Sequence, residues 1–187
     1  MQRLMLVLLL TACLIPLPAL TQGTDKQPAT KPAPSPSQAV LEAWNDVGRK
    51  LITMAEDFPE NKYEFKPNPA QRSFAEQLLH AAGDNYYFTN LTLGQKPPTE
   101  DPKRDQLKTK ADVVTFVKKA FADGGAAIQK RGDSGMAELV TDPNSHQQVR
   151  VVDLAYGIIE HSGEHYGQLV VYYRVAGLVP PESRPQK

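Results

Sequence analysis

The amino-acid sequence predicts an all-α protein whose helices form an antiparallel four-helix bundle. Four long segments carry apolar residues at spacings of three and four, which is the period of an amphipathic helix. The sequence shows no succession of strands with alternating apolar and polar residues, and it has no internal repeat. Its 187 residues, 41% of them hydrophobic, suit one compact domain with additional terminal segments.

The first predicted helix begins near Ser37, because serine caps helix N-termini through its side-chain oxygen. The apolar residues that follow recur at helical spacing: Val40, Trp44, Val47, Leu51 and Met54. Pro59 and the prolines within residues 65–69 end this pattern, since proline lacks an amide donor and disfavours helix in the residue before it.

The second predicted helix covers residues 70–92, and a loop rich in proline follows it. The apolar side of this helix is made of Phe74, Leu78, Ala81 and Ala82. The prolines of the loop are Pro97, Pro98 and Pro102. Because proline supplies no amide donor, the loop is expected to separate this helix from the next one.

The third predicted helix covers residues 111–130, although Gly124 and Gly125 weaken its continuity. Its first half is strongly apolar, with Val113, Val114, Phe116, Val117, Ala120 and Phe121. Residues 132–145 are predicted to form turns and loops, with a short strand-like pair around Leu139 and Val140.

The fourth predicted helix covers residues 146–176. It ends before Gly177, which tolerates a left-handed backbone, and the following Pro180 and Pro181 prevent its continuation. Its apolar stripe includes two histidines among residues spaced by three or four: Leu154, Ile158, His161, His165, Leu169 and Tyr172. Both histidines are therefore expected to face inward.

His161 and His165 point to a metal site. Residues four apart on a helix share a face, so both rings can reach one ion. A buried imidazole needs partners for its nitrogens, and a metal satisfies one nitrogen on each ring. The alternative is that the two histidines were kept for packing alone.

A third ligand is expected because catalytic zinc sites usually take three protein groups and leave one position open. His80 is the best candidate. Because the polar residues Gln77 and Asp84 share its side of the helix, the alternative is that His80 lies on the protein surface and binds no metal. His146 follows Asn144 and Ser145 near a predicted helix start, where polar residues usually serve solvent or capping roles.

Gly163 and Gly167 interrupt the helix around the histidines, and each costs about 1 kcal/mol relative to alanine. We attribute both to the close approach of a neighbouring helix or of a ligand. Tight packing without any ligand is the alternative explanation.

Glu164 makes residues 161–165 a formal match to the H-x-x-E-H pattern of some zinc peptidases. A peptidase of that kind is disfavoured, because only Glu182 follows as an acidic residue that could complete the site. Glu164 could activate a metal-bound water, and its alternative role is a solvated charge on the helix surface.

The N-terminus is predicted to be a signal peptide over residues 1–23, with Arg3 followed by an apolar run and then by Pro16 and Pro18. This predicts an exported protein, periplasmic or extracellular. The alternative is a lipoprotein anchored at Cys13, since residues 10–13 resemble a lipobox. Cys13 is the only cysteine, so disulfides and thiolate ligands are excluded from the mature body.

Residues 24–37 are rich in proline, lysine and small polar residues and are predicted to form a disordered tether before a bundle at residues 38–181. Residues 182–187 form a tail. Basic and acidic residues number 21 each, so no net field favours nucleic acid. No transmembrane helix is expected in the mature chain, and the oligomeric state is not specified by these residues.

The sequence resembles the DinB/YfiT-like superfamily over about residues 38–181. The resemblance is carried by residues 73–80 (Ser-Phe-Ala-Glu-Gln-Leu-Leu-His), by His161-x-x-x-His165-x-Gly-Gln-Leu, and by residues 172–181. It implies a four-helix bundle that holds a divalent metal, zinc or nickel, through His80, His161 and His165.

Some members of this superfamily are thiol S-transferases and others have been described as metal-dependent hydrolases. The resemblance therefore implies a metal-binding protein that could be an enzyme of one of these classes acting on a small molecule, and the predicted signal peptide makes it an exported one. A non-catalytic module that binds metal or a small ligand is the alternative. Low-molecular-weight thiol chemistry belongs to the cytosol, which conflicts with the predicted export, and no catalytic residue is assigned.

Overall fold

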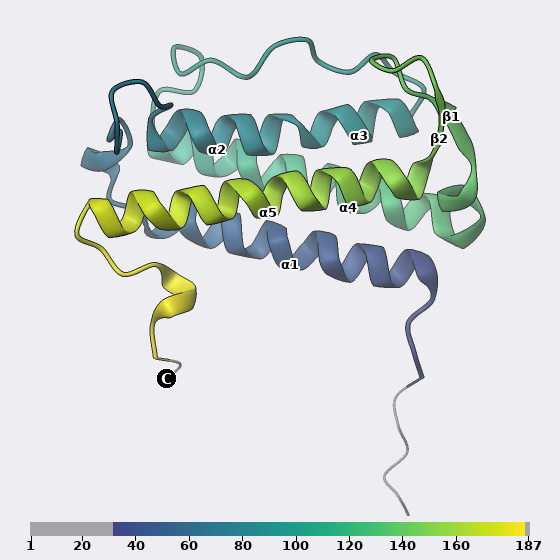
Figure 1. The fold of residues 1–187 in the computed structure, drawn as a ribbon, viewed down its shortest axis with the longest axis horizontal. Coiled ribbons are helices and arrows are strands. Elements are labelled where there is room, and N and C mark those ends of the chain that lie inside the picture. The colour runs from purple at the N-terminus through teal and green to yellow at the C-terminus, as the bar shows by residue number, and fades with distance from the viewer. Residues whose placement is uncertain (1–31, 186–187) are drawn as a thin grey trace, which may run out of the picture. The chain divides into compact units, whose positions relative to one another are not determined.

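The computed structural model describes residues 32–185, and the predicted signal peptide, Cys13 and most of the predicted tether lie outside this range. Four helical arms lie side by side, as Figure 1 shows, so the predicted four-helix bundle is confirmed. The helices are α1 (Pro36–Asp57), α2 (Phe74–Gly83), α3 (Asn85–Thr92), α4 (Lys110–Ala137) and α5 (Val151–Val175).

The arms are arranged so that α1 and α2 lie on a diagonal of the bundle. Helix α1 packs against α4 and α5, and α2 packs against the same two helices. Short 3-10 helices follow α1 and α5, at Glu60–Lys62 and Pro181–Ser183. Among the described residues, no helix is long and apolar enough to cross a membrane.

Local side-chain caps set the beginnings of three arms. A serine or threonine accepts from the third backbone amide of the helix, and the side chain of that third residue accepts from the backbone of the cap. The pairs are Ser35 with Gln38, Ser73 with Glu76, and Thr109 with Asp112. The first helix thus starts with Ser35 as its cap, slightly before the predicted Ser37.

The second arm is two helices rather than the single predicted helix over residues 70–92. Ser73 caps α2, so residues 70–73 precede the helix, and Asp84 separates α2 from α3. Asp84 keeps right-handed helical angles (φ −66°, ψ −18°), and the two helices follow nearly one line in Figure 1. The break therefore leaves the arm intact and places Asp84 in its middle.

Helix α4 runs through Gly124 and Gly125 without interruption and bends only at Gly132, where φ is 59°. Gly124 is small because of the buried Trp44. A Cβ added at Gly124 would lie 2.0 Å from Cζ2 of the indole, whose Nε1 donates to the Phe121 carbonyl (2.9 Å). Gly124 thus permits the close packing of α1 against α4, whereas a Cβ at Gly125 would make only ordinary contacts, 3.5 Å or more from its neighbours.

The start of the last helix was predicted wrongly. Residues 148–150 form strand β2 (Gln148–Arg150), which pairs antiparallel with β1 (Leu139–Thr141), and α5 begins only at Val151. The Asp142 side chain accepts from the backbone amide of Asn144 (2.9 Å) and closes the hairpin turn. The strand expected around Leu139 and Val140 is therefore confirmed as β1. Its partner strand β2 lies within the range 146–176 that is predicted to be helical.

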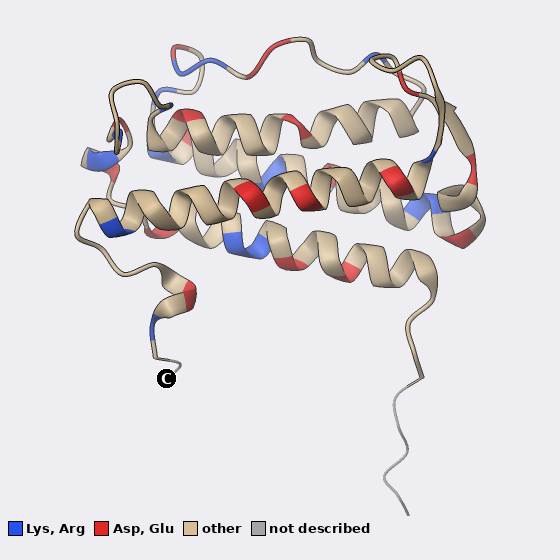
Figure 2. Ribbon diagram, viewed as in Figure 1, with Lys and Arg blue, Asp and Glu red and all other residues tan. Residues whose placement is uncertain are grey.

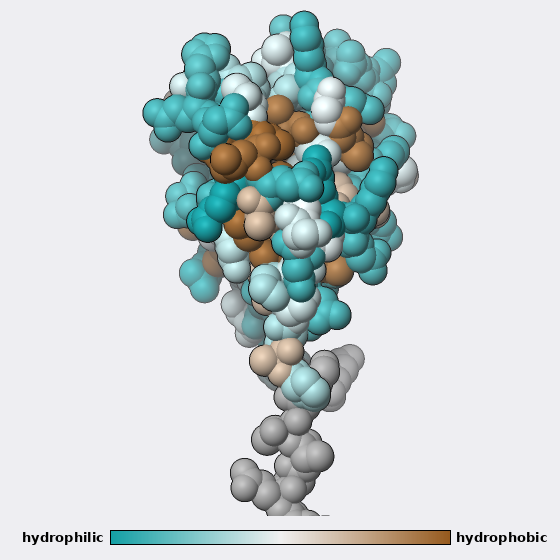
Figure 3. All heavy atoms as spheres, turned by 90° about the vertical axis from the view of Figure 1, so that its right-hand side faces the viewer, coloured by the Kyte–Doolittle hydropathy of each residue, from teal (hydrophilic) through white to brown (hydrophobic). Residues whose placement is uncertain are grey.

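The hairpin end of the bundle exposes hydrophobic residues framed by hydrophilic ones, as Figure 3 shows. Leu139 on β1 has 62% of its surface exposed. Beyond the opposite end of α5, the chain folds back onto α1, where Arg49 donates to Glu182 (2.7 Å) and Arg184 to Asp57 (2.6 Å). Glu182 and Arg184 of the predicted tail are thus held against the first helix.

The predicted close approach of a neighbouring helix at Gly163 and Gly167 is wrong. Both glycines are exposed, and among the described residues no side chain of another element lies within 4 Å of a Cβ added at either position. They lie on the outward side of α5, which Figure 2 shows to carry several acidic residues. Packing of the described chain does not require glycine at either position.

Candidate metal centre

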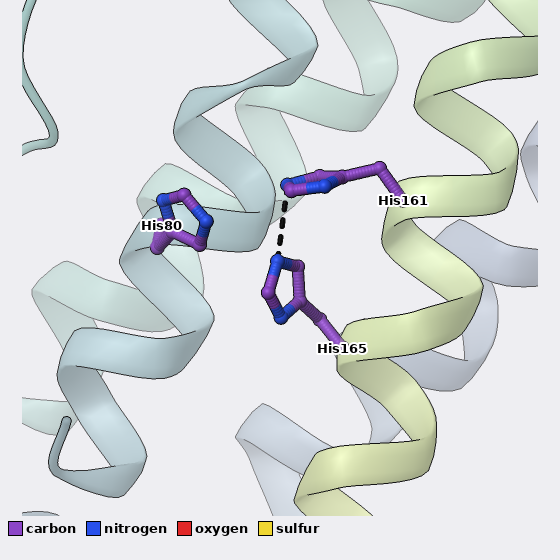
Figure 4. Close-up of side chains that lie close together, drawn as sticks. All are labelled: His80, His161 and His165. Carbon is purple, nitrogen blue, oxygen red and sulfur yellow. Dashed lines mark hydrogen bonds between the residues drawn. The ribbon is translucent and has the colours of Figure 1, made fainter. Parts of the chain in front are cut away.

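The fold brings His80, His161 and His165 together between α2 and α5 (Figure 4). One ring nitrogen from each histidine lies within 4.8 Å of the others, and the Nε2 atoms of His161 and His165 are 3.1 Å apart. Two nitrogens bound tetrahedrally to zinc at 2.0–2.1 Å stand about 3.3 Å apart. The α5 pair is therefore already close to the spacing that a shared ion requires.

The three rings differ in burial. His165 is buried, with 6% of its surface exposed, whereas the side chains of His80 and His161 are partly exposed. Burial lowers the pKa of His165, and the charges of His161 and His80 add to this, while the hydrogen bond with Gln168 opposes it. The neutral ring, which is the form that binds metal, is thereby favoured.

The ring nitrogen of His165 that faces away from the other histidines, Nδ1, lies between the side chains of two glutamines. This Nδ1 lies 2.9 Å from Oε1 of Gln168 and also contacts the side-chain amide of Gln77, which itself donates to Gln168 (2.6 Å). Nδ1 can satisfy only one of these contacts as a hydrogen bond: if Nδ1–H donates to the Gln168 oxygen, Nε2 keeps its lone pair toward the other histidines, whereas a bond accepted from the Gln77 amide would put the proton on Nε2. Hydrogen bonds of this kind orient the ligands of known metal sites.

The outer nitrogen of His80 is held by Asp101, which lies in the loop between α3 and α4. Nδ1 of His80 lies 3.0 Å from both carboxylate oxygens, and Arg72 pairs with the same carboxylate at 3.4 Å. An ionised carboxylate only accepts, so Nδ1 carries the proton and Nε2 is free. His80, Asp84 and Asp101 also form a second group of ligand atoms within 4.8 Å, which shares His80 with the first.

Asp84 extends the histidine cluster toward solvent. Its Oδ2 lies 2.8 Å from Nε2 of His161 and 3.9 Å from Nε2 of His80. Burial raises the pKa of this carboxyl group, but the hydrogen bond from His161 and the charges of the histidines outweigh burial and bring the pKa below its ordinary 3.8. Asp84 is thus a carboxylate at neutral pH.

A cavity of about 800 Å³ opens beside His161 and Asp84. One wall is the loop at residues 96–101, a second is the hairpin turn at Pro143 and Asn144, and α5 contributes Gly157 and Ile158. Tyr87 on α3 lines the cavity and donates to Asp142, which fixes the hairpin turn against the helices. The histidine cluster therefore has one open side, large enough for a small molecule.

Two residues considered from the sequence lie away from the centre. His146 is exposed in the hairpin turn, with φ of 58°, and Glu164 is exposed on α5. Neither belongs to a group of potential ligands among the described residues. Of the residues predicted to face inward on α5, those from His165 to Tyr172 are buried, whereas Leu154, Ile158 and His161 are only partly buried. Ile158 and His161 line the cavity instead.

Four polar residues of the centre were not predicted as site residues: Gln77, Asp84, Asp101 and Gln168. Asp84 could have been found, because it follows His80 by four residues and so lies on the same helix face. Asp101 reaches His80 from a loop and has no periodic pattern that would identify it.

The sequence matches the DinB superfamily over residues 43–169. This region contains His80, His161 and His165. None of the curated proteins compared with the chain matches it.

Solved structures of DinB-like proteins share the fold. A protein from Bacillus cereus has 15% identity and a TM-score of 0.65, and the match covers 77% of this chain and 95% of that one. YjoA from Bacillus subtilis has 17% identity and a TM-score of 0.63, covering 79% and 99%.

YfiT from Bacillus subtilis, described as a probable metal-dependent hydrolase with an unusual four-helix bundle topology, has 13% identity and a TM-score of 0.61, covering 81% and 94%. At these identities the likeness concerns the fold. The family match covers more than half of this chain and agrees with the shared fold. The predicted family is therefore confirmed, and the chain belongs to the DinB superfamily.

Proposed function

We propose that this protein binds one divalent metal ion, zinc or nickel, through Nε2 of His80, His161 and His165, and hydrolyses a small molecule that enters the adjoining cavity. The observation that carries the proposal is the convergence of three imidazoles, two of which have their outer nitrogens held by hydrogen-bond partners. Without an ion, the Nε2 atoms of His161 and His165 can share one N–H···N hydrogen bond at 3.1 Å, whereas an ion would use a lone pair from each of the three rings.

The donor set fits such an ion. Imidazole nitrogens suit zinc and nickel, and a site with three protein ligands leaves a position for water or substrate. A bound divalent ion of this kind lowers the pKa of a coordinated water and polarises a substrate carbonyl. The cavity beside His161 gives a small molecule access to that position.

Asp84 is the proposed proton acceptor. In the metal-free arrangement its Oδ2 accepts from Nε2 of His161 (2.8 Å). When that nitrogen serves as a ligand it no longer donates, and the carboxylate oxygen becomes available at the cavity wall. Its lowered pKa keeps it ionised, as a general base must be before it takes a proton.

A non-catalytic binding module is the second candidate, and the position of Asp84 is the observation that favours it. If Oδ2 binds the ion directly, four protein ligands fill a tetrahedral site and no position remains for substrate. A thiol S-transferase would need the same open position as the hydrolase, so it shares this requirement.

Export to the periplasm or the exterior belongs to the same proposal and is supported by the signal-peptide pattern of residues 1–23. The mass of the mature protein tests it. Cleavage within residues 19–23 supports a secreted protein, whereas a lipid-modified N-terminus at Cys13 would indicate the lipoprotein alternative.

Metal titration of the mature protein tests the ligand set. We expect about one equivalent of zinc or nickel, and His80→Ala, His161→Ala and His165→Ala should each weaken affinity beyond the roughly 10–100-fold loss that outer-shell changes cause. His146→Ala is the matched control, because His146 is exposed and lies outside the cluster. Equal affinity of His161→Ala and His146→Ala would overturn the site.

Asp84→Asn separates catalysis from simple binding. As a proton acceptor, Asp84 should be dispensable for metal affinity but required for hydrolysis of a panel of small esters and amides. As a ligand, it should be required for affinity, and the absorption spectrum of the cobalt form should change with the substitution. Unchanged affinity and unchanged hydrolysis would refute both roles.

A further inference from the structure

The long loop between α3 and α4, residues 93–109, packs closely against the end of α2 at Pro102. A Cβ added at Gly83 would lie 2.9 Å from Cδ of Pro102, so the proline can sit there only because position 83 is glycine. Arg104 continues the anchoring by donating to Glu64 (2.8 Å) and to the Lys108 carbonyl (2.8 Å). The part of the loop around Pro102 is thus packed in a fixed position against α2.

The packing of Pro102 against α2 places Asp101 beside Nδ1 of His80. Both carboxylate oxygens lie 3.0 Å from Nδ1, and Nη2 of Arg72 lies 3.4 Å from Oδ2. Asp101 is therefore held in place by Pro102, which follows it in the chain, and by Arg72. The His80 side chain, 17% exposed, has its ring direction determined by this contact.

We propose that Asp101 is a positioning residue that holds His80 in the Nδ1–H tautomer, with Nε2 directed at the metal, and so couples loop 93–109 to the metal centre. The inference rests on the proposed metal site. A carboxylate acceptor fixes the tautomer and the ring orientation of a ligand histidine and increases its basicity. Asp101 acts through His80 and does not touch the ion.

The coupling has a structural consequence because the same loop forms a wall of the cavity. Residues 96–101 line it, and Asp101 is the last of them. An ion on Nε2 strengthens the hydrogen bond that Nδ1 donates to Asp101, since the ring becomes more positive. Metal binding should therefore slow the opening of the loop. Without the Asp101 carboxylate, metal binding should no longer affect how fast the loop opens.

The tautomer of His80 is measured directly in the metal-free protein by long-range ¹H–¹⁵N NMR at mildly alkaline pH. We expect the proton on Nδ1 in the wild type and in Asp101→Asn, whose amide oxygen still accepts, and a mixture of tautomers in Asp101→Ala. Glu100→Ala is the matched control, since Glu100 lies in the same loop and pairs only with Lys103 among the described residues. A proton on Nε2 in the wild type would overturn the proposal.

Zinc affinity and hydrogen exchange provide the second readout. Asp101→Ala should lose roughly 10–100-fold in zinc affinity, whereas Asp101→Asn and Glu100→Ala should remain near the wild type. Zinc should increase the protection of loop amides in the wild type and Glu100→Ala but not in Asp101→Ala. Equal losses in the Asn and Ala variants would show that an acceptor oxygen at position 101 is not enough, and would overturn the role of Asp101 in fixing the tautomer.

The failure of the metal proposal is distinguishable from the failure of this one. If the wild type binds neither zinc nor nickel, the proposed function is wrong. The tautomer measurement needs no metal, and equal Nδ1–H populations in the wild type and Asp101→Ala would overturn the role of Asp101 in either case.

Discussion

Replacing glycine by alanine should have opposite effects at Gly124 and Gly167, although both lie inside long helices. At Gly124 the new Cβ would lie 2.0 Å from Cζ2 of Trp44, and real Cβ contacts essentially never fall below 3.0 Å. The indole must therefore move by about 1 Å. Trp44 is fully buried and its Nε1 donates to the Phe121 carbonyl at 2.9 Å, so it cannot move without disturbing the core.

The magnitudes follow from these contacts. Overpacking costs about 1–3 kcal/mol, and distortion of a buried hydrogen bond costs about 1 kcal/mol more, while alanine regains about 1 kcal/mol of helix propensity. Gly124→Ala should thus lower the free energy of unfolding by about 1–3 kcal/mol. Gly167→Ala meets no side chain of another element within 4 Å among the described residues and should raise it by up to about 1 kcal/mol.

Urea unfolding of the metal-free protein, followed by circular dichroism, measures both effects. The midpoints should move in opposite directions at an unchanged slope, because neither substitution alters the surface exposed on unfolding. Equal shifts in the same direction would refute the assignment of Gly124 as a close contact and of Gly167 as open. Gly163→Ala is a second open position and should behave as Gly167→Ala does.

Two further predictions concern the centre and its surroundings. Because burial lowers the pKa of His165 below its ordinary 6.5, the unfolded chain binds more protons just below that pH, and the free energy of unfolding should rise with pH up to about 6.5. Urea unfolding of metal-free wild type and His165→Gln checks this, and an equal slope against pH in both would contradict it. Ser162 is fully buried and its Oγ lacks a hydrogen-bond partner among the described residues, so Ser162→Ala should be neutral or stabilising by up to about 1 kcal/mol. A loss of more than that in thermal unfolding would show that the hydroxyl has a partner.

The sequence predicted the helices well because their determinants are local. Spacings of three and four placed Val40, Trp44 and Leu51 on the buried side of α1, and all three are buried. The same local logic failed at residues 146–150. The pairing of β2 with β1 joins residues on either side of a turn, and it removed these residues from the helix that their composition had suggested.

Candidate site residues were predictable to the extent that they share a helix. His161 and His165 lie on one face by their spacing, and the structure places their Nε2 atoms 3.1 Å apart. His80 could be only a candidate from spacing, because its distance to α5 depends on how two helices pack. The need for glycine at position 124 could not be predicted from the sequence either, because the side chain that requires it, Trp44, belongs to another helix.

By itself, therefore, the sequence determined the fold class, the family resemblance and the histidine pair, because each depends on residue types at short and regular spacing. Tertiary structure alone decided that Asp84 reaches His161, that Asp101 joins His80, that a cavity opens beside them, and that Gly163 and Gly167 face no packed neighbour in the described chain. The physical reason is that these contacts join segments far apart in sequence, and their distances are set by the packing of helices and the seating of a loop.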